Sequence, residues 1–192
     1  MPGIREVASR LPPLCEAESY VDINMNEEFA NLLTELYRPP SDVFRIARSM
    51  KTVPGHEAML LDELQRQVDL DDEPKILFLL WAVSLAAPSP VFTPILCLLL
   101  EEKKGCYYLE AAVDAMHDVA DEASVACLRA ALGREEPWDQ DFAFNRKILW
   151  ALERIGTPEA VDAIRSALNN KHARISETAE EILERLGGWT TT

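Results

Sequence analysis

Several signatures of catalysis are missing from this sequence of 192 residues. Its seven glycines are scattered and form no glycine-rich loop that could cradle phosphate, so nucleotide binding has no support. The three histidines, His56, His117 and His172, stand far apart without the spacing of a zinc site. The sequence contains no nucleophile-elbow motif and no Cys–His pair in a recognisable context. We therefore predict no catalytic residue, no metal and no cofactor.

Cysteine pairs of the Cys-x-x-Cys type are also absent. Of the four cysteines, Cys97 and Cys127 lie inside apolar helical patterns, where a free thiol behaves as a small hydrophobe. The opening residues MPGIREVASR contain no apolar signal core. Together these features predict free thiols and a reducing, cytoplasmic setting.

Basic residues are sparse. The chain has 33 acids against 19 bases, a formal net charge of −14, and neither residues 11–37 nor residues 105–128 contain Lys or Arg. Because phosphate backbones are held by several cations at once, we exclude nucleic acid as the main ligand, and anionic membranes are repelled likewise. The charge favours a basic partner, although it is equally consistent with a role in solubility alone.

One uncharged stretch, residues 76–100, is as long as a membrane span. Pro88, Pro90 and Pro94 interrupt it, and proline is accepted in the first turn of a soluble helix but not in its interior. We therefore predict two buried helices joined at residues 87–90, and no membrane partner.

An internal repeat is the strongest feature present. Residues 115–132 and 151–168 align without a gap at an offset of 36 residues, and each block contains two short helical patterns around a tight turn. In the second block, Gly156 suits the end of a helix, Thr157 the cap of the next and Pro158 its first position. Asp121 is the equivalent cap in the first block. Residues 82–99 fit the template at an offset of 33, and residues 47–64 fit loosely.

The repeat predicts ten helices, near residues 26–37, 41–50, 55–68, 74–87, 91–103, 107–119, 122–132, 142–155, 158–169 and 173–186. Residues 1–25 form an N-terminal arm of undetermined order, and residues 26–192 form one repeat domain. Since one helix pair cannot bury its apolar stripe alone, neighbouring pairs must stack and share one long core.

The segment ALERIGTPEAVDAIRSALNN, followed by ISETAEEILERLG, resembles the bacterial HEAT-like repeat first described in phycobilisome lyases. The match is best over residues 107–187. The resemblance implies an all-α, right-handed α-solenoid of about five helix pairs, whose second-type helices line the concave side. It also implies macromolecular binding rather than a reaction, although fold alone does not identify the function.

The repeat register suggests where a partner would bind. Core positions are expected at Val125, Leu128 and Leu132 and their equivalents Val161, Ile164 and Leu168. The positions between them should face the groove, in one row of Ala58, Thr93, Ala126 and Asp162 and a second of Leu61, Leu96, Arg129 and Arg165. For Arg129 and Arg165, a ladder of bonds to neighbouring turns is the competing interpretation. Leu61 and Leu96 would likewise be core residues if the register were shifted by one position.

Other side chains extend this prediction. Trp138, in a long polar loop, is either an exposed anchor or tucked against a helix end, whereas Trp81 and Trp150 are expected in the core. The acidic residues 69 and 71–73 are read as a solvated loop in which Asp71 caps the next helix. The predicted partner-binding set is Leu61, Asp62, Leu96, Arg129, Trp138, Asp162 and Arg165.

The sequence analysis therefore favours a monomeric, non-enzymatic module that binds a basic protein through its concave face, for example an immunity protein that blocks a bacterial toxin. Two alternatives stay open, a subunit of bilin-lyase type and a self-assembling scaffold.

Overall fold

The computed structural model describes residues 27–38, 41–102, 106–139 and 141–187, and this part of the chain is helical without strands. Each predicted helix is present, with ends that differ by a few residues. The predicted N-terminal arm lies outside the described residues. The helices are α1 (Glu27–Leu36), α2 (Val43–Met50), α3 (His56–Leu70), α4 (Glu73–Ala86), α5 (Thr93–Glu102), α6 (Leu109–Val119), α7 (Val125–Ala131), α8 (Ala143–Ile155), α9 (Pro158–Ser166) and α10 (Ala173–Arg185), with 3-10 turns η3 (Pro90–Phe92), η4 (Glu122–Ser124) and η5 (Ala167–Asn169).

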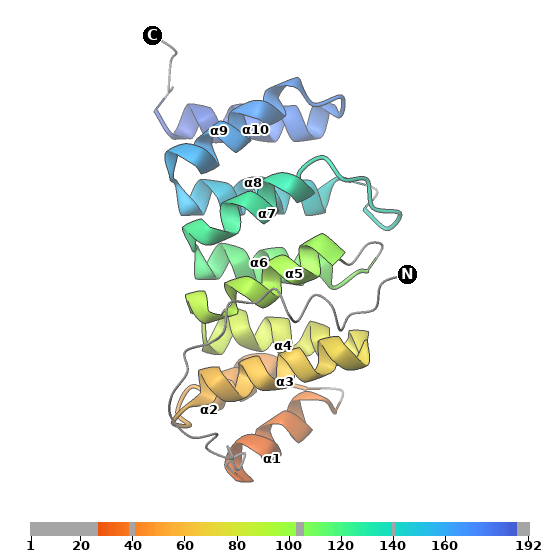
Figure 1. The fold of residues 1–192 in the computed structure, drawn as a ribbon, viewed down its shortest axis with the longest axis vertical. Helices are drawn as coiled ribbons and strands as arrows, with labels where there is room; N and C mark the ends of the chain where they lie inside the picture. The colour runs from red at the N-terminus through yellow and green to blue at the C-terminus, as the bar shows by residue number, and fades with distance from the viewer. Residues whose placement is uncertain (1–26, 39–40, 103–105, 140, 188–192) are drawn as a thin grey trace, which may run out of the picture.

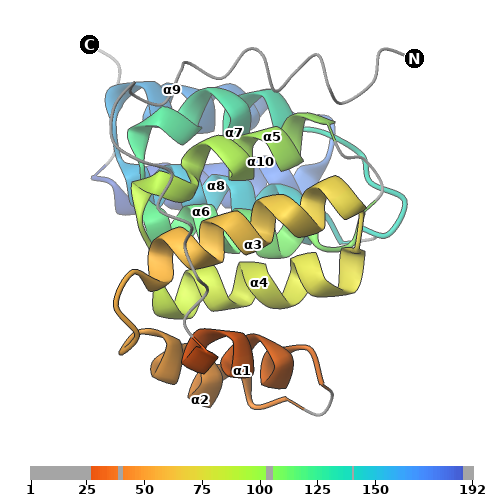
Figure 2. The same cartoon turned by 60° about the horizontal axis from the view of Figure 1, so that its bottom comes forward.

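The helices stack in two layers along one long axis, which makes the chain an α-solenoid (Figure 1). Helices α2, α4, α6, α8 and α10, the first-type helices, pack against one another in sequence order. Helices α3, α5, α7 and α9, the second-type helices, form the other layer, as Figure 2 shows from a second direction. This arrangement confirms the fold predicted from the repeat.

The turns form because of local glycine, capping and proline residues, which were identified in the sequence. Gly156 adopts a left-handed conformation with φ of 69° and ends α8. The Thr157 hydroxyl then accepts a hydrogen bond from the amide of Ala160 at 3.3 Å, and Pro158 occupies the first turn of α9. At the start of α4 the cap is Asp72 and not Asp71, which instead takes the left-handed position that ends α3.

First-type helices repeat in a regular register. The fully buried residues Ala47, Leu80, Val113 and Leu149 occupy the same position on α2, α4, α6 and α8. The step from Ala47 to Leu80 is 33 residues, and the same step recurs from Leu80 to Val113 before it lengthens to 36. The loose fit of residues 47–64 to the repeat therefore came from an alignment that was two residues out of register at α2.

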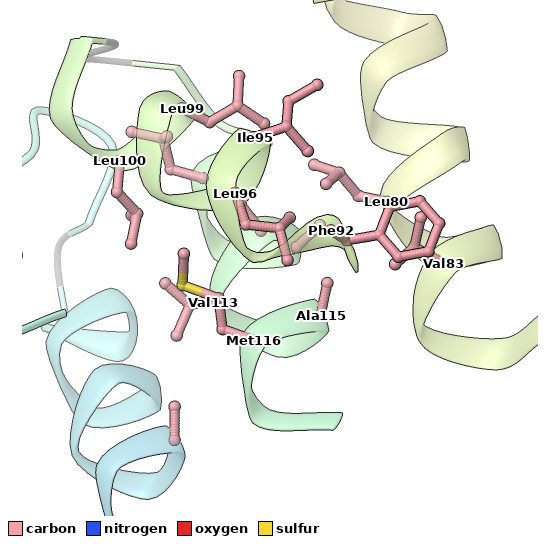
Figure 3. Packing of buried hydrophobic residues seen from close by; sticks show 14 of the residues in the cluster. Leu80, Val83, Phe92, Ile95, Leu96, Leu99, Leu100, Val113, Ala115 and Met116 are labelled. Carbon is pink, nitrogen blue, oxygen red and sulfur yellow. The ribbon is translucent and has the colours of Figure 1, made fainter. Parts of the chain in front are cut away.

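Second-type helices have a different register because the connection within each helix pair shortens along the stack. The α4–α5 connection is one residue shorter than α2–α3 and one residue longer than α6–α7 and α8–α9. The buried positions Leu64, Leu96, Leu128 and Ile164 are equivalent, with steps of 32, 32 and 36 residues. Figure 3 shows Leu96 among the buried side chains of α4, α5 and α6. The prediction that Leu96 faces a groove is therefore wrong, since Leu96 lies one position closer to the core than the ungapped alignment placed it and is fully buried. Thr93 is also mostly buried, but its side chain lines the groove between α5 and α7 that is described below.

Three further placements differ from the prediction. Trp81 and Trp150 are 38% and 37% exposed, because both lie on the outer surface of the first-type layer rather than in the core. Leu168 is 40% exposed, because the buried position is Ala167, the equivalent of Leu99 and Ala131 on the preceding second-type helices.

The predicted free thiols are also corrected. Cys97 and Cys127 form a disulfide that joins α5 to α7, with their Cα atoms 5.5 Å apart. The apolar pattern placed each cysteine on its helix, but it did not show that the two helices bring them together. The argument for a reducing compartment loses this support. Within the described residues, no helix has the length and apolar character needed to cross a membrane.

Candidate functional site

The outward row of the second-type helices lies two residues before the buried positions given above. It consists of Asp62, Pro94, Ala126 and Asp162, and all four are exposed. We call the surface that this row and its exposed neighbours form the second-type face. Predicted site residues Asp62 and Asp162 therefore lie on one face, although they come from helices at opposite ends of the stack.

A groove of about 380 Å³ opens on the second-type face between α5 and α7. Its wall on the α5 side is built from two prolines and the stem of Glu101, and its wall on the α7 side from small side chains. Alanines at this place on α7 leave the space that larger side chains would fill. The lining residues are Pro90, Thr93, Pro94, Cys97, Glu101, Asp121, Ala123, Ala126 and Cys127.

The disulfide lies along this groove and fixes its width. Cys97 occupies the position that Arg129 and Arg165 hold on the next two second-type helices, so the repeat places it beside α7. Cys127 is only 4% exposed, whereas Cys97 is partly exposed. The bond constrains α5 and α7 covalently, over a sequence separation of 30 residues.

A hydrogen bond at one end of the groove links the start of α5 to the cap of the η4 turn that precedes α7. The Thr93 hydroxyl donates to the carboxylate of Asp121 at 2.7 Å. The other carboxylate oxygen of Asp121 accepts from the amide of Ala123 at 3.1 Å, which caps the η4 turn as predicted. Thr93 is therefore a structural residue, and its carboxylate partner carries negative charge at the edge of the groove.

Glu101 supplies a second carboxylate. It is exposed at the C-terminal end of α5, and no ion-pair partner contacts it among the described residues. Together, Glu101 and Asp121 give a mostly apolar groove an acidic rim. Such a site can accept the aliphatic stem of a Lys or Arg side chain while its charged end meets a carboxylate.

The two arginines of the predicted set do not form a ladder between repeats. Arg165 donates to the carboxylate of Asp162 at 2.5 Å, which lies on the same helix one turn earlier. Arg129 is exposed, and its side chain forms no hydrogen bond or ion pair within the part of the chain that the structure describes. Both remain available on the second-type face.

The remaining predicted residues are less accessible. Leu61 is partly buried and packs against the core. Trp138 is also partly buried and meets the ring of Phe144 edge-on, with centroids 5.8 Å apart, so it is tucked against α8 and is not an exposed anchor. The loop around it is fixed from within, because the buried Asn145 amide bonds to the backbone of Gly133 and Arg134.

A buried carboxylate anchors α1 to α3, away from the groove. Glu63 is 3% exposed and accepts hydrogen bonds from Tyr37, Arg66 and Gln67 at 2.7–2.8 Å. Burial alone would raise the pKa of the Glu63 carboxyl, but the bonds from Arg66, Tyr37 and Gln67 outweigh it and hold that pKa below its usual value. Burial and the bond to Glu63 raise the pKa of Tyr37.

The hydrogen bonds to the Glu63 carboxylate hold these helices together. Within the described ranges, no group of three or more His, Cys, Asp or Glu side chains is placed to hold a metal ion.

Sequence reasoning missed the groove itself and the disulfide. The groove depends on the one-residue difference between the α4–α5 and α6–α7 connections, which an ungapped alignment cannot show. The signal lies in burial and not in residue type. Phe92, Ile95 and Leu99 are buried like Ser124, Cys127 and Ala131, but the sequence alone favours the offset of 33, at which they align with Val125, Leu128 and Leu132.

The stacked helix pairs and their turn chemistry define a helical-repeat protein, an α-solenoid. Residues 145–170, from α8 to the end of the α9 unit, match the family model of the PBS lyase HEAT-like repeat. The match confirms the resemblance predicted from the sequence and covers one helix pair, so it identifies the repeat and not an activity. No curated protein and no solved structure matches the chain significantly.

Proposed function

We propose that this chain is a non-enzymatic module that binds a basic protein through its second-type face. The observation that carries the proposal is the groove between α5 and α7, whose apolar walls end in the carboxylates of Glu101 and Asp121. Ligand-binding solenoids use extended surfaces of this kind because each repeat contributes one strip of side chains.

The charges around the groove support a cationic partner. Exposed acids on the described second-type helices and their turns outnumber the bases, of which Arg66 is paired with Glu63 and Arg165 with Asp162. Arg129 differs from these two arginines, because no acid pairs with it among the described residues. A cationic side chain of the partner would meet a net negative potential there, which raises the association rate and helps to orient the complex. The exposed acids are Glu57, Asp62, Asp69, Glu101, Glu102, Glu122, Glu159 and Asp162.

A narrower version makes this chain an immunity or antagonist protein that neutralises a basic toxin or nuclease. Its small size and acidity motivate that version. It requires a tight one-to-one complex with the product of a neighbouring gene, and calorimetry that detects no binding to any such product would contradict it.

The test compares two charge reversals of equal size. Partners captured by the wild-type chain are identified by mass spectrometry, purified and titrated calorimetrically against Glu101→Lys and Glu181→Lys. Both glutamates are exposed on helix surfaces, but Glu181 lies on α10, away from the groove. We expect Glu101→Lys to weaken binding by about tenfold, or about 1.4 kcal/mol, and Glu181→Lys to leave it unchanged.

Equal affinities for the two variants would place the interface elsewhere. A captured partner that is acidic overall would contradict the electrostatic argument, whatever its affinity.

A further inference from the structure

The outer surface of the first-type layer carries a second pattern, on the opposite side of the stack from the groove. One residue after the buried Ala47, Leu80, Val113 and Leu149, each first-type helix presents an outward side chain. These equivalent residues are Arg48 on α2, Trp81 on α4, Asp114 on α6 and Trp150 on α8. The first three of these helices therefore present a cation, an aromatic ring and an anion in turn.

The central helix, α4, is apolar on its outer side as well as on its buried side. Trp81 is 38% exposed and meets the ring of Phe78 edge-on, with centroids 5.7 Å apart. Leu77 and Leu85 flank these rings and are partly exposed. A helix at the surface of a monomer normally places polar residues on its outer face, so this apolar strip indicates a contact surface.

The strip on the α2 side is cationic. Arg48 and Lys51 are exposed one turn apart, and no carboxylate pairs with either of them among the described residues. Arg45 points differently, toward the end of the stack, and forms an ion pair with Glu35 of α1. The positive charge next to the apolar strip is therefore carried by Arg48 and Lys51.

The strip on the α6 side is anionic. Glu110, Asp114 and Asp118 lie along α6, and Asp114 and Asp118 expose 45% and 43% of their side chains. Lys147 of α8 reaches over to Glu110 at 3.0 Å and to Asp114 at 2.6 Å. One cation against three carboxylates leaves this strip negative, and among the described residues Asp118 is paired only with His117.

This order of strips is self-complementary. A two-fold axis that runs parallel to α4 within the contact plane places α4 against α4, and it turns α2 of one copy toward α6 of the other. The cations on α2 of each copy then face the carboxylates on α6 of the other, so this contact occurs twice, and the two apolar strips cover each other. Isologous interfaces in two-fold dimers have this property, in which residue i contacts j while j contacts i.

We propose that a second copy of this chain binds the strip centred on Trp81, to form a two-fold symmetric dimer. A basic peptide would match the α6 side but would be repelled at α2, and an acidic peptide would face the reverse conflict. A partner must carry both signs in the opposite order, and a second copy supplies that order without further assumptions. The dimer leaves both second-type faces uncovered, so it goes beyond the proposed binding function and does not depend on it. It departs from the monomer expected from the sequence.

The central test is sedimentation of the whole chain at micromolar concentrations and about 0.15 M salt, where screening over about 8 Å weakens the long-range repulsion between two acidic chains. The wild-type chain is expected to sediment as a dimer. Trp81→Glu places a charge at the centre of the contact and should weaken the dimer by about 30-fold or more, the effect of losing a hot-spot residue. Trp150→Glu is the matched control, because Trp150 has the same exposure two helices away. It should remain dimeric, and circular dichroism confirms that both variants are folded.

A charge swap tests the symmetry. Lys51→Glu and Asp118→Lys should each weaken the dimer, because each creates like-charge contacts across the axis. When both substitutions are made in one chain, opposite charges face each other again and dimerisation should return. The proposal would be overturned by a wild-type chain that is monomeric at all micromolar concentrations or by a dimer that survives Trp81→Glu. A double variant that dimerises no better than either single variant would also overturn it.

Discussion

The two layers of this solenoid share one repeat but differ in what they show to solvent. The first-type layer is built from helices of 8 to 14 residues whose central buried positions repeat from α2 to α8, and its outer row alternates charged and aromatic side chains. The second-type layer contains one helix of 15 residues, α3, followed by three of 7 to 10 residues that adjoin 3-10 turns, and its outer row is small or acidic. Regular packing therefore supports one layer, while a disulfide and side-chain hydrogen bonds supplement packing in the other.

The largest effect should come from the regularly packed layer. Leu152 of α8 is fully buried between neighbouring first-type helices. Leu152→Ala is expected to lower the free energy of unfolding by about 3 to 4 kcal/mol, because it removes buried methyl groups and leaves a cavity. Leu168→Ala is the control on the other layer and should cost less than about 1 kcal/mol, since Leu168 is 40% exposed. Urea denaturation followed by circular dichroism measures both, and similar losses would remove the distinction between the layers.

The disulfide should have the next largest effect. Replacing Cys97 and Cys127 together by alanine is expected to lower the free energy of unfolding by about 3 kcal/mol. The reason is that the unfolded chain without the disulfide has a higher conformational entropy than one with a closed loop of this length. A dithiol reductant should lower the melting temperature of the wild-type chain and leave that of the double variant unchanged. A wild-type melting temperature that does not respond to reductant, once thiol titration shows full reduction, would contradict this prediction.

The Glu63 cluster gives a smaller effect that depends on pH. Glu63→Ala should cost about 2 kcal/mol near neutral pH, because Tyr37 and Gln67 lose a buried acceptor. The folded-state pKa of Glu63 is lowered, so its contribution is present above the unfolded pKa of about 4.3 and is lost as pH falls through the folded value. Wild-type and variant stabilities should therefore converge in acid. A difference between them that stays constant from pH 7 to strongly acidic pH would show that the carboxylate charge is not involved.

The smallest effect should come from the outer row of the second-type layer. Arg165→Ala removes a surface ion pair with Asp162 and should change the free energy of unfolding by less than about 0.5 kcal/mol. The same substitution should alter binding of a basic partner in the favourable direction, because it removes a cation from the second-type face. Calorimetric titration of that partner against the variant measures this change, and weaker binding would assign Arg165 a direct contact.

Sequence reasoning recovered the fold because the helix caps and the apolar periodicity are local properties. Thr157, Gly156 and Asp121 act as predicted, and the helix positions follow from the spacing of buried side chains. The site was harder to predict because it depends on register. The α4–α5 connection has one residue more than the α6–α7 connection. As a result Leu96 lies in the core, and Pro94 and Glu101 line the groove.

Other differences arise where a helix pattern cannot distinguish between two surfaces. Trp81 and Trp150 fit an apolar pattern, yet they lie on its outer edge, because α4 and α8 carry more large apolar side chains than the core accommodates. The Cys97–Cys127 bond depends on the distance between two helices that are separated by a third, and no local pattern contains that distance.

The bond between α5 and α7 also has a mechanical consequence. Helix α6 lies wholly within the loop that Cys97 and Cys127 close, so tension applied at the two ends of the chain cannot pull that helix out lengthwise. Stretching would unravel α8 to α10 from one end and α1 to α4 from the other, while the enclosed segment adds nothing to the extended length. The segment between Cys97 and Cys127 would therefore not extend under tension until a reductant breaks the disulfide.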